Sequence, residues 1–92
     1  MDRNVGRILD CLAETGLAEN TLLIYCADHG EGAGEHGLFW KQTYYDSSAA
    51  IPLIARLPGT IAAGRTSADI VNLTDLGTTF HEIAGSEPDA SC

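Results

Sequence analysis

Two short apolar runs constrain the fold of this chain more than any other feature. TLLIYCA, at residues 21–27, is a continuous stretch of β-forming side chains, and IPLIARL follows at 51–57. Runs of this length and composition are typical of strands that are covered on both faces. Pro52 lies near the start of the second run, where a missing backbone N–H is tolerated. The pattern predicts buried strands of a layered α/β domain.

An amphipathic helix is predicted before the first strand. Residues 2–16 carry apolar side chains at the i, i+3, i+4, i+7 spacing of one helix face. Asp2 can cap the start of this helix, and Gly16 is suited to end it. A helix that leads into a buried strand favours the same α/β class.

The second half of the chain predicts two more helical segments and one more strand. Residues 42–50 are compatible with a short helical turn, and the apolar stretch 69–73 predicts a third short strand. A last helix is expected up to Gly85, with Thr74 or Asp75 as its N-cap. These short strands and two helices do not cover one another, so the pattern indicates part of a larger sheet.

Size and charge exclude several classes of function. The 92 residues suffice for one small domain, and their 45% hydrophobic content fits a globular chain. Thirteen acidic and five basic residues leave a net charge of −8, with no basic stripe for nucleic acid or for an anionic membrane surface. No run approaches the roughly 18 apolar residues of a membrane span.

The three cysteines indicate neither a zinc site nor a redox site. Cys11, Cys26 and Cys92 are widely spaced and form no CxxC pair. Cys11 and Cys26 are expected in the core as small hydrophobic side chains. The odd count favours a reducing compartment, and the N-terminus lacks the apolar region of a signal peptide, so a cytoplasmic setting is favoured.

The loop that follows the first strand carries most of the chemistry. It reads CADHGEGAGEHGLFWK from residue 26 to 41. Asp28 and His29 lie at the carboxyl end of a strand, where open α/β sheets place their active sites. Their oxygen and nitrogen atoms suit a divalent cation. The alternative is that Asp28 only starts a turn and that His29 is an exposed side chain. Lys41, the only lysine, is either an exposed side chain or a point charge for an anion.

The same loop contains a GxGxxG match that is a poor dinucleotide site. The match runs from Gly32 to Gly37, but DHGE separates it from the strand and no helical stripe follows. Glu31 and Glu35 would repel a pyrophosphate. The glycines are better explained by the geometry of the loop.

Four segments in order resemble the sulfatase family of the alkaline-phosphatase-like superfamily. The block ADHGEGAGEHGLFWK is similar to the family's [ST]DHGE-x-x-GEHGL-x-x-K pattern, and the resemblance spans nearly the whole chain. The other three segments are DRNVGRILDCLAETGLAENTLLIY, YYDSSAAIPLIARLPG and IVNLTDLGTTFHEIAG. The resemblance implies a partial alkaline-phosphatase-like α/β sandwich and a hydrolase of sulfuric esters.

The resemblance also assigns site residues. Asp28 and His29 match the family's ligands for a divalent metal, commonly Ca²⁺, with Mg²⁺ or Mn²⁺ as alternatives. Lys41 matches the lysine that contacts the sulfate group. His36, Phe39 and Trp40 are candidates for the substrate pocket. Tyr44, Tyr45 and Asp46 are expected to order the wall behind the site.

The chain departs from the family pattern at the nucleophile. The family uses a formylglycine made from Cys or Ser in a C/S-x-P/A-x-R motif, and none of the three cysteines has that context. The remaining metal ligands and sulfate-binding residues of the family have no match either. We therefore expect residues 1–92 to be a single fragment of a sulfatase catalytic domain, truncated at both ends with a polar tail at 86–92, and inactive alone.

Two other functions remain open from the sequence. A phosphodiester or phosphonate monoester hydrolase of the same superfamily would use the same DHG block and lysine. A non-catalytic remnant or a small acidic metal-binding module is the second alternative. In either case strands without neighbours would favour self-association of the isolated chain.

Overall fold

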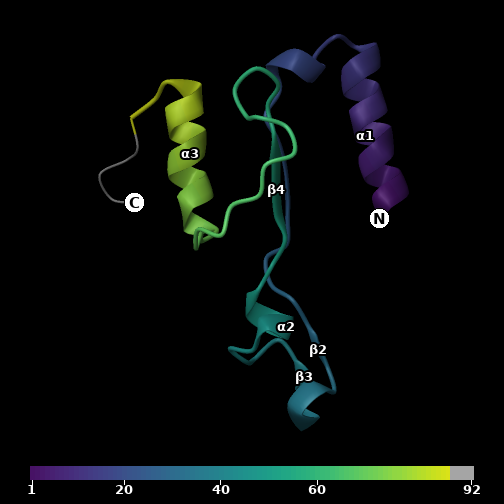
Figure 1. Cartoon of the computed structure of the whole chain (residues 1–92), viewed down its shortest axis with the longest axis vertical. Helices are drawn as coiled ribbons and strands as arrows, with labels where there is room; N and C mark the ends of the chain where they lie inside the picture. The colour runs from purple at the N-terminus through teal and green to yellow at the C-terminus, as the bar shows by residue number, and fades with distance from the viewer. Residues whose placement is uncertain (88–92) are drawn as a thin grey trace.

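A two-stranded antiparallel sheet forms the centre of the computed structural model, which describes residues 1–87 (Figure 1). β1 (Leu23–Cys26) pairs with β4 (Leu53–Arg56), so that the first residue of each strand lies opposite the last residue of the other. Both strands fall within the runs that predict them. The sheet has two strands because each run meets its partner along one edge only.

Two helices lie on either side of the upper end of this sheet (Figure 1). α1 (Asp2–Glu14) is followed by the 3₁₀ turn η1 (Ala18–Asn20), and α3 (Thr74–Ala84) ends the described chain. Both helices end as expected, because Gly16 and Gly85 adopt left-handed φ angles of 73° and 66°. At each end the two residues that close the helix donate their N–H groups back to its last turn.

The helix starts differ from the expected caps. Asp2 lies in the first turn of α1 without a capping hydrogen bond from the preceding residue. Before α3, Asn72 Oδ1 accepts the N–H of Thr74 at 3.1 Å, and the Asp75 carboxylate accepts the N–H of Asn72 at 2.7 Å. Asn72 and Asp75 therefore cap the start of α3 together, each accepting a backbone N–H from the segment that contains the other. The expected Asp75 takes part in this cap, and Asn72 takes the place expected for Thr74.

A small projection carries the loop between the two long strands. β2 (Gly32–Ala33) pairs antiparallel with β3 (Phe39–Trp40), and the 3₁₀ turn η2 (Glu35–Gly37) joins them. α2 (Asp46–Ala49) follows and packs beside this hairpin, below the central sheet in Figure 1. The loop expected at 28–41 thus contains a short hairpin, and the short helical turn expected within 42–50 is α2.

The molecule has no hydrophobic core of its own. Among residues 1–87 no hydrophobic side chain is buried, and every residue of β1 is only half-buried. The accessible surface is 7792 Å², against about 5,100 Å² for a folded monomer of this mass. The radius of gyration is 16.3 Å, against about 12 Å for a compact chain of this length. Within these residues the strands are not covered on both faces, since β1 is half-buried and most of β4 is exposed, which agrees with the expectation of a part of a larger sheet.

Two further expectations are corrected by the structure. Residues 69–73 form no strand, because this segment has no ladder partner within the described chain, and Ile70 is fully exposed. Cys11 is exposed on α1 rather than in a core, and Cys26 is half-buried. Cys92 and most of the tail expected at 86–92 lie outside the described residues.

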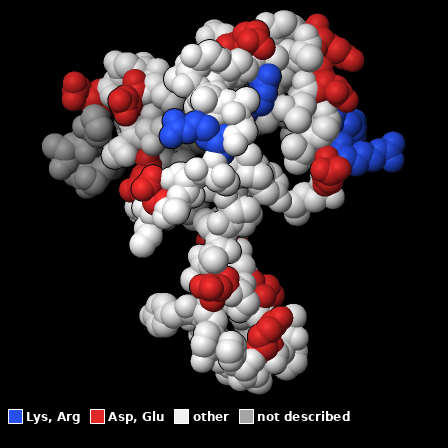
Figure 2. Space-filling model, in the orientation of Figure 1, with Lys and Arg blue, Asp and Glu red and all other residues white. Residues whose placement is uncertain are grey.

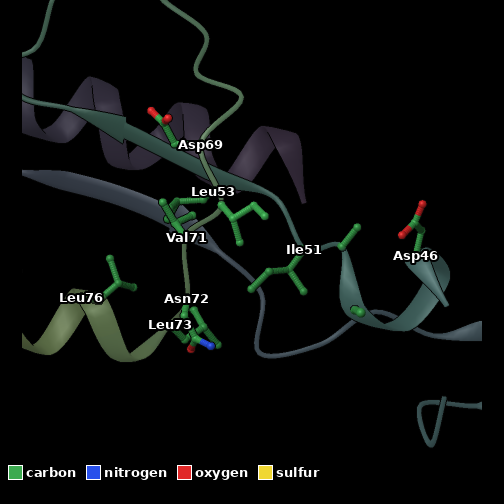
Figure 3. Close-up of a pocket in the computed structure, with 11 residues that line it drawn as sticks. Asp46, Ile51, Leu53, Asp69, Val71, Asn72, Leu73 and Leu76 are labelled. Atoms are coloured by element: carbon green, nitrogen blue, oxygen red, sulfur yellow. The ribbon is translucent and has the colours of Figure 1, made fainter. Parts of the chain in front are cut away.

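Open apolar hollows separate the sheet from both helices. One of about 450 Å³ lies between β4 and the segment that leads into α3, with Leu53, Val71 and Leu76 along its wall (Figure 3). Another of about 370 Å³ separates α1 from the sheet. Within residues 1–87, none of the helices is long and apolar enough to cross a membrane.

Candidate functional site

The two candidate metal ligands directly follow β1. The strand ends at Cys26, and two residues later the Asp28 Oδ1 atom accepts the backbone N–H of His29 at 3.0 Å. The Asp28 side chain is 82% exposed, whereas the His29 ring is only 32% exposed. The strand therefore anchors a carboxylate that remains accessible beside a ring that is partly enclosed.

Two hydrogen bonds determine the tautomer of His29. Its Nδ1 atom lies 2.7 Å from the carbonyl oxygen of Gly30, and its Nε2 atom lies 2.8 Å from the Lys41 Nζ atom. A carbonyl only accepts and an ammonium only donates, so the proton is on Nδ1 and the Nε2 lone pair faces Lys41. The ring is thus oriented as in metal-ligating histidines, whose second nitrogen commonly donates to a carbonyl.

The pair Asp28–His29 presents two acceptor atoms side by side. Asp28 Oδ2 lies 3.3 Å from His29 Nε2. Because the single Nε2 lone pair accepts from Lys41, this approach is not a salt bridge but two acceptor atoms side by side, and a cation can take the Nε2 lone pair only when Lys41 moves away. Two ligands at a right angle, each about 2.3 Å from a cation, are about 3.3 Å apart. The separation fits neighbouring positions in the shell of one divalent cation.

The pair accounts for only part of such a shell. Ca²⁺ takes about six to eight oxygen-rich ligands, and a smaller divalent ion takes about six. No group of three or more histidine, cysteine, aspartate or glutamate side chains comes together anywhere in residues 1–87. The donors of this chain therefore fit a divalent cation as two of its ligands.

The hairpin brings Lys41 back to the start of the loop. β2 and β3 reverse the chain direction, with Gly32 opposite Trp40, so the residue after β3 returns to the residues before β2. This is why Lys41 and His29, twelve positions apart, are in hydrogen-bond contact. The structure thus brings Asp28, His29 and Lys41 together.

The lysine is also the only cation of this part of the molecule. No other Lys or Arg occurs between residues 8 and 55, whereas the segment from Asp28 to Asp46 contains four carboxylates. On the face drawn in Figure 2 the lower projection shows acidic side chains and no basic ones. An anion that reaches this loop would therefore find its one favourable side-chain charge at Lys41.

The three candidate pocket residues lie further along the hairpin. The His36 ring stacks on Tyr45, with centroids 4.0 Å apart and planes 16° from parallel. Phe39 and Trp40 are 65% and 73% exposed, and Trp40 has a left-handed φ of 77°. In this chain they form an open aromatic edge next to Lys41 rather than an enclosed pocket.

Glu35 holds the turn of the hairpin. Its Oε2 atom accepts the N–H of Ala33 at 2.7 Å. Hydrogen bonds from the backbone N–H groups of Glu35 itself and of Ala33 hold the pKa of this carboxyl below its ordinary value of 4.5. The side chain is therefore a structural acceptor in its charged form.

The sequence did not reveal how α2 contacts the loop. The N–H of Gly30 donates to the carbonyl of Ser48 at 2.8 Å, and a Cβ at Gly30 would lie 2.1 Å from the Ser47 carbonyl oxygen. A glycine directly after His29 and a pair of small serines are the only signals of this contact. Tyr45, expected in the wall behind the site, contacts it through His36.

Comparison with known proteins finds similarity of this chain to sulfatases. The model of the family named Sulfatase matches residues 1–86. The chain is 41% identical over 87 residues to an N-acetylglucosamine-6-O-sulfatase of Bacteroides thetaiotaomicron and 40% identical over 84 residues to arylsulfatase K of Homo sapiens. A choline-sulfatase of Rhizobium meliloti is 38% identical over 85 residues. These matches cover 95%, 91% and 92% of this chain.

The fold itself matches a solved structure. A protein in complex with its substrate, D-glucosamine-2-N,6-O-disulfate, superposes with a TM-score of 0.90 at 40% identity, over 97% of this chain. The chain covers 18% of that structure and about 16% of the length of the curated relatives. The conformation therefore corresponds to one part of a much larger molecule.

Proposed function

Because this chain belongs to the sulfatase family, we propose that it forms one wall of a site that hydrolyses a small-molecule sulfate ester. The observation that carries the proposal is the convergence of three groups: Asp28 Oδ2 and Lys41 Nζ lie 3.3 Å and 2.8 Å from His29 Nε2. One cation position and one anion-binding ammonium would then be adjacent, which is the arrangement that a charged ester needs.

In this proposal Asp28 and His29 hold a divalent cation, which the family resemblance suggests is Ca²⁺. When bound, the cation draws negative charge away from the sulfuryl oxygens. The Gly30 carbonyl keeps the His29 ring in the tautomer whose Nε2 carries no proton, so that Nε2 can ligate once Lys41 leaves it. Lys41 turns from His29 to a sulfate oxygen and offsets the charge that grows there as the ester bond breaks. His36, Phe39 and Trp40 line the side on which the alcohol leaves.

The wall is incomplete without residues from outside these 92. We propose that the formylglycine nucleophile and the remaining cation ligands belong to another part of a sulfatase catalytic domain, of which residues 1–92 are a fragment. Two ligands hold a divalent cation weakly, and no covalent step can proceed without a nucleophile. The isolated chain is therefore proposed to be inactive.

A graft tests the role of the three groups. Residues 1–86 would replace the matching segment of the Bacteroides thetaiotaomicron sulfatase, which is 41% identical, and sulfate-ester hydrolysis would be measured. We expect an active chimera in which Lys41→Ala lowers kcat roughly a hundredfold and Asp28→Ala raises the Ca²⁺ concentration needed for activity. Relative rates on sulfate and phosphonate esters would show which ester the wall favours.

Asp10→Ala is the matched control, since Asp10 is an exposed carboxylate on α1 far along the chain from the loop. The control should keep the activity of the chimera. A folded chimera whose Asp28→Ala and Lys41→Ala variants are as active as the control would contradict the proposal. Turnover of an aryl sulfate by the purified 92-residue chain, or tight Ca²⁺ binding by it that Asp28→Ala removes, would contradict the incompleteness of the site.

A further inference from the structure

We propose that α2, together with Tyr45 before it, is a clamp that positions Asp28, His29 and Lys41. The clamp is defined by Tyr45, Ser47 and Ser48. Ser47 and Ser48 contact the start of the loop, Tyr45 contacts its tip, and Ser48 also binds the segment at its end. These are positioning residues, because they act through the loop and not on a ligand. The inference rests on the proposed metal and sulfate roles of the three groups.

The first attachment is a direct contact between two backbones. The N–H of Gly30 donates to the Ser48 carbonyl at 2.8 Å. A Cβ at Gly30 would lie 2.1 Å from the Ser47 carbonyl oxygen, a distance that real Cβ atoms do not show. The contact therefore requires glycine for space, and not for an unusual φ angle. Any larger side chain would push the loop off α2.

The same glycine orients the metal-ligating ring. While its N–H is bound to α2, its carbonyl accepts the Nδ1–H of His29 at 2.7 Å. The position of α2 thus determines the plane of the imidazole, because Gly30 is bound to both. A shift of Gly30 would rotate Nε2 away from Asp28 Oδ2 and change their 3.3 Å separation.

The second attachment is at the end of the loop. The Thr43 hydroxyl donates to the Ser48 hydroxyl at 3.1 Å. Ser48 is 4% exposed and is the only buried polar or charged side chain among residues 1–87. Lys41 lies two residues before Thr43, so this bond limits how far the ammonium can move from His29.

The third attachment is at the tip. His36 stacks on Tyr45, which is the residue directly before α2. His36 adopts a left-handed φ of 56°, which side chains other than glycine seldom adopt. The stacking of the His36 ring on Tyr45 is favourable and helps to stabilise this backbone conformation. The loop is therefore held at three points by α2 and the tyrosine directly before it.

The clamp can be tested with Mn²⁺ alone as the probe and the 92-residue chain as it is. Mn²⁺ broadens the proton resonances of a histidine ring that it approaches, so NMR titration reports its occupancy at His29, with His81 on α3 as the internal reference. We expect Gly30→Ala to raise about tenfold the Mn²⁺ concentration that broadens the His29 resonances. Loss of the hydrogen-bond partner behind a metal ligand typically lowers metal affinity by about this factor. Gly77→Ala should leave it unchanged, because a Cβ there meets nothing within 4 Å.

The tip contact provides an independent pair of variants. Tyr45→Ala should weaken the response at His29, and Tyr45→Phe, which keeps the ring, should restore it. This pair decides the question if circular dichroism shows that Gly30→Ala has lost its helices. Because Tyr45→Ala removes only the stacking partner of His36, its circular dichroism should remain that of the wild type, and this separates loss of positioning from loss of structure.

Two results would overturn the clamp in different ways. If Asp28→Ala abolishes the response while Gly30→Ala and Tyr45→Ala keep it at the wild-type level, the metal pair exists and α2 does not position it. If the response at His29 survives Asp28→Ala, the proposed metal pair itself is wrong, and the clamp has nothing to position.

Discussion

At the scale of single residues, the chemistry of the loop depends on which atoms accept and which donate. His29 Nδ1 donates to Gly30 and its Nε2 accepts from Lys41. Their position after a strand makes Asp28 and His29 candidate ligands, with an oxygen and a nitrogen donor, and the resemblance to sulfatases is what assigns them that role. Which imidazole nitrogen is available could not be read from the sequence, because it depends on the orientation of the Gly30 carbonyl and on the Lys41 ammonium that the hairpin brings back.

Glu35 supports a prediction about pH. Its pKa is lowered by backbone N–H groups, so the folded hairpin favours the charged carboxylate. A carboxyl with a depressed folded pKa stabilises the fold fully above its unfolded pKa, and this stabilisation is lost as the pH falls through the folded value. We expect the Ala33 amide resonance to be constant from neutral pH down to near 4.5 and to shift at lower pH.

Glu35→Gln is the matched variant, because it keeps the acceptor oxygen and removes the titration. The Ala33 amide should then show no shift in the acid range. An identical acid shift in Glu35→Gln would contradict the assignment and would indicate another carboxylate as the cause.

At the scale of elements, the ends of the helices were predictable and their packing was not. Gly16 and Gly85 end α1 and α3 where the sequence indicates, because a left-handed residue is a local requirement. The stretch 69–73 was expected to be a strand and is not one. A strand exists only where a second strand supplies its hydrogen bonds. The presence of that second strand cannot be read from the five residues themselves.

Two glycines of α3 should respond in opposite directions to the same change. Gly85→Ala places a Cβ at a φ of 66° and should destabilise the end of α3 by about 1 kcal/mol. Gly77→Ala lies in the interior of α3, where nothing surrounds a new Cβ, and should stabilise the helix by about 0.5–1 kcal/mol. Hydrogen exchange of the α3 amides in the full chain measures both changes, and equal signs would contradict the cap assignment.

At the scale of the whole molecule, the isolated chain exposes surfaces that a complete domain would cover. None of the hydrophobic side chains of residues 1–87 is buried, and the chain spans about 16% of its relatives. Sheet edges without partners pair readily with other chains. We propose that the 92-residue chain self-associates through β1 and β4.

Ile54→Lys tests this association. Ile54 lies on β4 and is 62% exposed, so a charge there should reduce pairing between sheets. Ile83→Lys, at a 53% exposed residue of α3, is the matched control and should leave the association unchanged. Sedimentation velocity measures both. A wild-type chain that sediments as a monomer and melts in one sharp transition would contradict the prediction.

The sequence by itself determined the helix ends, the two strands and the chemical character of the loop, with Asp28, His29 and Lys41 as its candidate site residues. These follow from periodicity and backbone preference, which act over a few neighbouring residues. The tertiary structure decided the rest: that β1 and β4 pair antiparallel, that a hairpin returns Lys41 to His29, and that α2 contacts Gly30. It also decided that Cys11 and β1 are not buried. Contacts and burial depend on which distant surfaces meet, and the apolar pattern of a strand shows only that it can be covered.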